Sequence, residues 1–162
     1  MPFDPALALN RSQVLPEWID YNGHMNVAFY VLAFDKALDS FCERYDLSLD
    51  YMKRSNCSTF VLEAHVTYQQ EVLLGDPLHF TLQLLDVDPK RLHYFMRMYH
   101  ADKGFLAATS EQLMVHVDMS DRRVAPMPTA TLARLEALTT EHAGLPRPEE
   151  AGRIIGIRRK NA

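Results

Sequence analysis

Residues 20–26 read DYNGHMN, and residues 27–45 continue as VAFYVLAFDKALDSFCERY. Apolar side chains in the second stretch recur at steps of three and four residues, which is the period of a helix. These positions are Val27, Tyr30, Val31, Phe34, Leu38, Phe41 and Tyr45. The first half of the stretch is apolar on all sides, so we predict a helix that is buried on most of its surface. Asn26 is its expected N-cap.

The apolar period changes to two after this helix, which predicts β-strands. Alternation is clear from Thr59 to Tyr68, and further strands are predicted at residues 78–87, 91–100 and 105–117. The strands at residues 78–87 and 91–100 should form a hairpin, because Asp88-Pro89-Lys90 between them favours a turn. A weaker alternation predicts one more strand at residues 12–19, which Pro16 would confine to a sheet edge or a bulge.

The C-terminal part combines an amphipathic helix with a polar tail. We predict this helix at residues 128–142, with Pro128 near its start and Gly144 just past its end. A chain of 162 residues fits one domain. We therefore expect a single domain at 1–145 and an extended tail at 146–162, whose basic residues are Arg153, Arg158, Arg159 and Lys160.

Composition excludes several classes of protein. The net charge of −4 argues against a nucleic-acid binder, for which a basic face is expected. The sequence has neither a stretch of the ~18 to 20 apolar residues that a membrane span needs nor a signal peptide, so we expect a cytoplasmic protein without a membrane partner. The two cysteines, Cys42 and Cys57, lack the spacing of a zinc site and are expected to be buried, reduced thiols.

Residues 20–26 also suggest chemistry, because a carboxylate, an imidazole and an amide stand directly before a helix. The first turn of a helix has free backbone N–H groups, which can polarise a carbonyl group beside Asp20. That pairing suits hydrolysis of an ester or thioester. Serine-nucleophile, phosphoryl-transfer, zinc-protease and dinucleotide motifs are absent, which lowers the weight of those reactions.

The order of these features resembles the hotdog-fold thioesterases, in particular the 4-hydroxybenzoyl-CoA thioesterase-like family, over about residues 8–120. The matching pieces are Asp20, Gly23, His24, Asn26 and Tyr30 at the helix start, and Tyr68 and the turn Gly75-Asp76 in the sheet. The resemblance implies an α+β hotdog fold, in which a curved antiparallel sheet wraps a long central helix, here with an extra C-terminal helix. It also implies a homodimer or a dimer of dimers, with active sites between subunits.

The family mechanism makes Asp20 the catalytic carboxylate, acting either as a nucleophile or as a base for water. Backbone N–H groups from Gly23 to Asn26 would stabilise the oxyanion, each such donor being worth ~2.7 to 4 kcal/mol. His24 would orient Asp20 or water, or else be a structural residue, and Asp20 itself could be no more than a helix-entry cap. We expect no metal and no cofactor, since CoA is part of the substrate.

A finer resemblance rests on residues 60–71 (FVLEAHVTYQQE), 88–95 (DPKRLHYF) and 108–114 (ATSEQLM). These segments resemble the thioesterases of bacterial carnitine breakdown, which hydrolyse betainyl-CoA to glycine betaine and CoA. Aromatic faces helped by a carboxylate bind a trimethylammonium group, at roughly 0.5 to 2 kcal/mol per contact. The residues that could form such a cage near Asp20 are Trp18, Phe29, Tyr30, Phe60, Tyr68 and Glu63.

Simpler interpretations stay open at this point. The aromatic residues could fill the core, Glu63 could be a solvated strand residue, and Asn26 could be a cap rather than part of the substrate site. Lys90 and Arg91 are candidates for holding the CoA phosphates. The alternatives in function are a thioesterase for a fatty or aromatic acyl-CoA and a non-catalytic acyl-CoA-binding hotdog protein. A hotdog hydratase is disfavoured, because its Asp and His lie one residue further apart.

Overall fold

A computed structural model of the chain describes residues 6–159. The first five residues of the predicted domain and the last three of the tail, which include Lys160, lie outside the described residues. The elements in chain order are β1 (Leu7–Ala8), β2 (Ser12–Gln13), the 3-10 helix η1 (Pro16–Trp18), α1 (Val27–Arg44), α2 (Leu49–Ser55), β3 (Cys57–Tyr68), β4 (Pro77–Val87), β5 (Arg91–His100), β6 (Leu106–Asp118), β7 (Arg123–Val124) and α3 (Thr129–His142).

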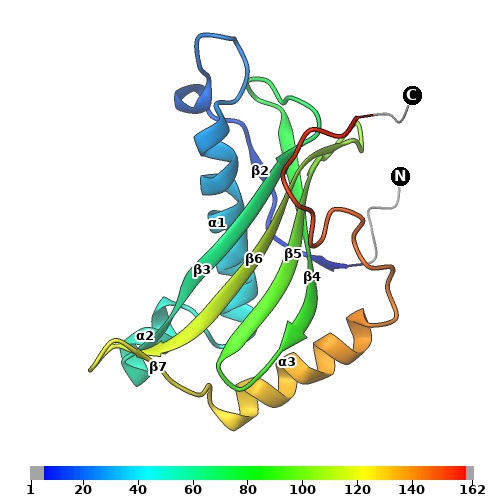
Figure 1. Ribbon diagram of the computed structural model, residues 1–162. Coiled ribbons are helices and arrows are strands. Elements are labelled where there is room, and N and C mark those ends of the chain that lie inside the picture. The colour runs from blue at the N-terminus through cyan, green and yellow to red at the C-terminus, as the bar shows by residue number, and fades with distance from the viewer. Residues whose placement is uncertain (1–5, 160–162) are drawn as a thin grey trace.

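The long helix α1 packs against one face of the sheet (Figure 1). It begins and ends within one residue of the predicted bounds, and the predicted cap is confirmed, because Asn26 Oδ1 accepts the N–H of Ala28 at 3.0 Å. Its buried face centres on Phe34, which is 0% exposed and meets the ring of Phe80 edge-on at 5.8 Å. Packing of this apolar face against the sheet contributes more to the stability of α1 than the helix propensity of its residues.

The sheet is antiparallel, with its main strands in the order β1-β4-β5-β6-β3. The predicted hairpin is confirmed as β4 and β5, and Asp88 fixes its turn by accepting the N–H groups of Lys90 and Arg91 at 2.8 Å. At the other end of the order, β3 pairs only with β6 among the described strands. This arrangement of three helices and an open antiparallel sheet confirms the predicted α+β hotdog fold.

A β-bulge in β3 decides which of its side chains face α1. The register with β6 shifts between Val61 and Glu63, so Leu62 is the extra residue. Beyond the bulge Tyr68 faces α1, where its ring meets that of Tyr30 at 5.1 Å. Glu63 lies opposite Leu113 and Phe60 opposite Val115, and both point to the other face of the sheet, called here the outer face.

Two local predictions were wrong or incomplete. The strand predicted at residues 12–19 ends at Gln13, because Pro16 starts the 3-10 helix η1 and places Trp18 in the core. The short helix α2 was not predicted. It is only seven residues long, which is too few for a clear apolar period, and it ends at Asn56 in the left-handed conformation.

The C-terminal segment returns to the sheet. Helix α3 packs against β4, where His142 Nδ1 accepts the N–H of Leu84 at 2.8 Å. The tail to residue 159 has no helix or strand, yet Pro148 is buried and the N–H of Gly152 donates to Glu111 Oε2 at 2.7 Å. In the described part of the chain, no helix has the length and apolar character that crossing a membrane requires.

The packing of α1 predicts a large loss of stability for Phe34→Ala. The free energy of unfolding should fall by about 3 to 5 kcal/mol, since the substitution leaves a cavity between helix and sheet. Chemical denaturation followed by circular dichroism measures this. The exposed neighbour provides the control, because Asp35→Ala should stay within about 0.5 kcal/mol of the wild type. Equal effects of the two substitutions would contradict the assignment of the core.

Candidate active site

A tight turn before α1 brings the side chains of Asp20 and His24 together. The N–H of Asp20 donates to the carbonyl of His24 at 3.1 Å, and the N–H of Gly23 donates to the carbonyl of Asp20 at 3.0 Å. Gly23 has a φ of 80°, a conformation that other residues rarely adopt. The glycine therefore serves the geometry of the turn that carries both side chains.

The carboxylate of Asp20 is held on both oxygens. Oδ1 accepts the N–H of Asn22 at 2.8 Å, while Oδ2 lies 3.4 Å from Asn26 Nδ2 and 3.8 Å from His24 Nε2. The Asp20 side chain is 14% exposed, so it is largely shielded but still open to a pocket. Asn26 thus both caps α1 and orients Asp20.

The structure adds Glu71, which the sequence did not single out as a site residue. Its Oε2 accepts a hydrogen bond from His24 Nδ1 at 3.0 Å, so His24 lies between two carboxylates. Glu71 belongs to the irregular loop between β3 and β4, where neither strand nor helix period marks a residue. The signal available in the sequence was its position three residues after Tyr68, a matched family residue.

Several hydrogen bonds fix the loop that carries Glu71 against the turn that carries Asp20 and His24. The carbonyl of Val72 accepts the N–H of Met25 at 3.0 Å, and the N–H of Val72 points to the hydroxyl of Tyr30 at 3.4 Å. Asp76 accepts the N–H of Leu73 at 2.8 Å. Nε2 of the buried His100 lies 3.3 Å from the other carboxylate oxygen of Asp76, on the sheet side of this loop.

The backbone N–H groups at the start of α1 differ in availability. Those of Gly23, Met25 and Asn26 donate to the carbonyls of Asp20, Val72 and Trp18, respectively. The N–H groups of His24 and Val27 have no acceptor among the described residues. Of the predicted segment from Gly23 to Asn26, only His24 keeps a free donor, and Val27 adds a second at the first helical position. Both residues line the pocket that opens beside Asp20.

A pocket of about 620 Å³ opens beside Asp20 and is lined by His24, Asn26, Val27, Tyr30, Tyr68 and Glu71, among others. Burial is the main cause that raises the pKa of both Tyr30 and Tyr68, and for Tyr30 the charge of Glu71 adds to it. Both phenols therefore stay neutral, and both side chains line the pocket, Tyr30 as a buried residue and Tyr68 as an exposed one. Among the described residues no lysine or arginine lines this pocket, whereas two carboxylates do.

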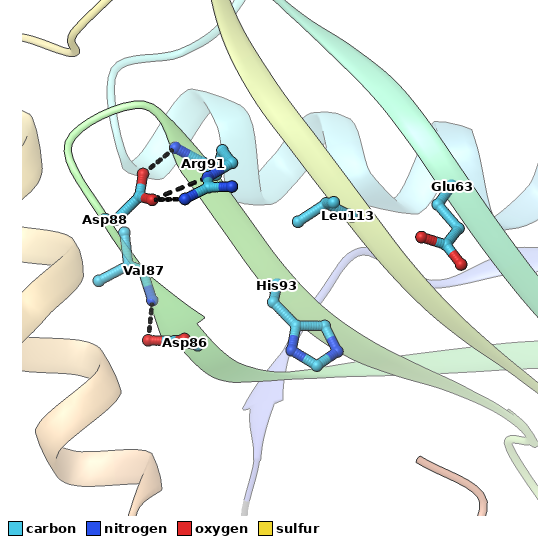
Figure 2. Close-up of a pocket in the computed structure, with 7 residues that line it drawn as sticks. All are labelled: Glu63, Asp86, Val87, Asp88, Arg91, His93 and Leu113. Atoms are coloured by element: carbon cyan, nitrogen blue, oxygen red, sulfur yellow. Dashed lines mark hydrogen bonds and ion pairs between the residues drawn. The ribbon is translucent and has the colours of Figure 1, made fainter. Parts of the chain in front are cut away.

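The other residues predicted for a cage lie elsewhere in the single chain. Trp18 is 2% exposed and stacks on Phe29 in the core, with the rings 6.0 Å apart. Phe60 is on the outer face under the guanidinium of Arg122. Glu63 lines a separate pocket of about 360 Å³ on that face, and Figure 2 shows its side chain on the same side of the sheet as His93 and Leu113.

Of the two basic residues proposed for CoA, Arg91 lines this second pocket, whereas Lys90 is exposed in the turn between β4 and β5. Figure 2 shows the guanidinium of Arg91 directed at Asp88, and the closest atoms of the pair are 2.6 Å apart. The hydrogen bond from Arg91 lowers the pKa of Asp88. Arg91 is therefore already engaged with a carboxylate, and a phosphate would have to compete for it.

Other chemistry has little support in the structure. Both cysteines are free, and burial raises the pKa of Cys42 to about 12, so its thiol is not a nucleophile at neutral pH. Within residues 6–159 no three side chains are placed to hold a metal ion. The residues that the structure brings together are Asp20, His24, Asn26, Tyr30, Tyr68 and Glu71.

The chain is similar to known thioesterases over nearly its whole length. The betainyl-CoA thioesterase of Pseudomonas aeruginosa is 41% identical over 152 residues, which cover 94% of this chain and 96% of that protein. The L-carnitine dehydrogenase/betainyl-CoA thioesterase of Rhizobium meliloti is 36% identical over 153 residues, 94% of this chain but only 31% of that longer protein. Among solved structures, SAV2348 of Staphylococcus aureus in complex with CoA superposes with a TM-score of 0.87.

That superposition covers 98% of this chain and 99% of SAV2348, with 30% sequence identity. The sequence also matches the Thioesterase-like superfamily over residues 14–135, a range that includes Asp20, Glu71 and all four long strands. This chain therefore belongs to the Thioesterase-like superfamily of hotdog proteins.

Proposed function

We propose that this thioesterase hydrolyses betainyl-CoA to glycine betaine and CoA. The observation that carries the proposal is the pocket beside Asp20, which joins a held carboxylate to two tyrosine rings and a second carboxylate. The high similarity to the Pseudomonas aeruginosa betainyl-CoA thioesterase over nearly the whole chain supports it independently. Both point to a thioester whose acyl group carries a positive charge.

In the proposed reaction, Asp20 either attacks the thioester carbonyl or removes a proton from the attacking water. In both routes the C–S bond breaks, water supplies the new oxygen of the acid, and the CoA thiolate takes a proton. The free N–H groups of His24 and Val27, two residues that line the same pocket, would stabilise the oxyanion at the helix start. His24, held by Glu71, is close enough to orient Asp20 or the water.

The acyl part of the proposal rests on the character of the pocket wall. Tyr30 and Tyr68 meet at nearly a right angle, 88° between ring planes, and so offer a concave aromatic corner to a ligand. A trimethylammonium group binds such faces by cation–π attraction. The carboxylates of Asp20 and Glu71 favour the same cation and disfavour an anionic acyl group.

We extend the proposal to a place in carnitine breakdown, in the cytoplasm. The supporting observation is that relatives such as the one from Rhizobium meliloti join an L-carnitine dehydrogenase to a betainyl-CoA thioesterase in one chain. A fused pair of this kind suggests that the two activities serve one sequence of reactions.

Replacing the catalytic carboxylate tests the proposed reaction. Asp20→Asn should lower kcat for betainyl-CoA by about 10²- to 10⁴-fold, because it removes the charged group but keeps the shape. Free-thiol release from betainyl-CoA, acetyl-CoA, a medium-chain acyl-CoA and 4-hydroxybenzoyl-CoA measures both turnover and preference. Calorimetric titration with betainyl-CoA shows whether the variant still binds its ligand.

Each alternative has its own result in this panel. A preference for the medium-chain or the aromatic thioester would keep the enzyme and exclude the cationic substrate. Binding without thiol release by the wild-type protein would indicate a non-catalytic acyl-CoA-binding protein. Unchanged turnover by Asp20→Asn would contradict the role of Asp20.

We also propose that the active form is a homodimer, or a dimer of dimers, joined along β3. One side of this twelve-residue strand has no partner strand among the described residues. Val61 and Leu62 on it are 45% and 62% exposed, and the exposed Val27 and Val31 of α1 add further apolar surface. An unpaired apolar edge of this length is a ready site for a second copy.

A charge placed on this edge should separate the subunits. Leu62→Lys should shift the molar mass from about twice 18.6 kDa to the monomer value, as measured by light scattering after size exclusion. Leu49→Lys provides a matched control, because Leu49 is 61% exposed but lies at the start of α2. A monomeric wild-type protein, or dissociation by the control alone, would contradict the proposed interface.

A further inference from the structure

We propose that Glu71 supplies the counter-charge that makes the pocket selective for a cationic acyl group. The inference rests on the proposed function and assigns recognition of the positive charge on the acyl group to Glu71. The sequence had offered Glu63 for this role, in company with the aromatic residues. The structure gives reasons to prefer Glu71 within a single chain.

The two carboxylates of the pocket differ in how fully they are engaged. Asp20 is held on both oxygens, by the N–H of Asn22 on one and by Asn26 on the other. Glu71 uses Oε2 for the hydrogen bond to His24, and its Oε1 has no partner among the described residues. One carboxylate is therefore committed to the reaction centre, whereas the other keeps an oxygen free to face a ligand.

The position of Glu71 also fits this role. Tyr68 ends β3 three residues before Glu71, and the N–H of the residue after Glu71, Val72, points to the hydroxyl of Tyr30. Both rings of the aromatic corner are thus tied to the segment that carries Glu71. A cation resting on these rings lies within range of the Glu71 charge, which acts over several ångströms even beside solvent.

Glu63 lacks these features. It lies opposite Leu113 on the outer face and lines the pocket drawn in Figure 2, on the other side of the sheet from Tyr68. The β-bulge at Leu62 lies directly before Glu63 and shifts the register of β3 against β6. Comparison of Glu63 with Glu71 therefore distinguishes the two assignments.

Glu71 could affect catalysis through His24, so the test must separate recognition from chemistry. A loss of chemistry slows every substrate by the same factor. A loss of charge recognition slows only the cationic substrate. The thioester 3,3-dimethylbutyryl-CoA has the shape of betainyl-CoA with carbon in place of the charged nitrogen, and the ratio of the two kcat/KM values reports charge recognition alone.

The experiment measures this ratio for the full-length wild type and for Glu71→Gln, Glu71→Asp, Glu63→Gln and Glu43→Gln. Glu71→Gln should lower the ratio by about two- to fivefold, the upper part of the range for one exposed charge pair. Its amide oxygen can still accept a hydrogen bond from His24. Glu71→Asp keeps the charge and should retain most of the ratio. Glu43→Gln, an exposed substitution on α1 outside the pocket, should leave it unchanged.

The other outcomes overturn the inference. If both substrates slow equally in Glu71→Gln, Glu71 acts through His24 and not on the acyl group. If Glu63→Gln lowers the ratio instead, the counter-charge belongs to Glu63. If the wild-type protein hydrolyses betainyl-CoA and 3,3-dimethylbutyryl-CoA with equal kcat/KM, the proposed betainyl-CoA function is itself wrong. If the wild type prefers betainyl-CoA but Glu71→Gln keeps that preference, only the role of Glu71 is wrong.

Discussion

The side chain of Asn26 links the fold of this protein to its chemistry. One end of the amide accepts the N–H of Ala28 and so caps α1, and the other end lies 3.4 Å from the carboxylate of Asp20. A cap of this kind is typically worth ~1 kcal/mol, which is modest for stability. Its larger effect is geometric, because it fixes the carboxylate of Asp20 relative to the start of α1, where the N–H groups of His24 and Val27 are free.

The rest of the site depends on where this capped end of α1 is held. The helix is fixed by the contact of Phe34 with the sheet, and its start is fixed by the hydrogen bond from Met25 to Val72. That bond joins the turn that carries Asp20 to the loop that carries Glu71. The pocket is thus built where a helix start, a strand end and one loop meet, which lets a small chain place two carboxylates and two tyrosine rings around one space.

Sequence periodicity predicted α1 and the four long strands, because they carry clear patterns and a recognisable turn follows β4. Their hotdog arrangement was predicted from the family resemblance. It was less informative where local geometry breaks the pattern. The bulge at Leu62 puts Phe60 on the outer face, although simple alternation groups it with Tyr68. Trp18 became a core residue because Pro16 starts a helical turn in place of a strand. Glu71 stands in an irregular loop, and only tertiary contacts bring it to His24.

The most direct measurement is a crystal structure of the Asp20→Asn protein with betainyl-CoA bound. We predict the trimethylammonium group within about 6 Å of the Tyr30 and Tyr68 rings. We also predict the thioester oxygen at roughly 2.7 to 3.2 Å from the backbone N of His24 or Val27. An acyl group bound on the outer face beside Glu63, with the helix start left unoccupied, would contradict this placement of the substrate.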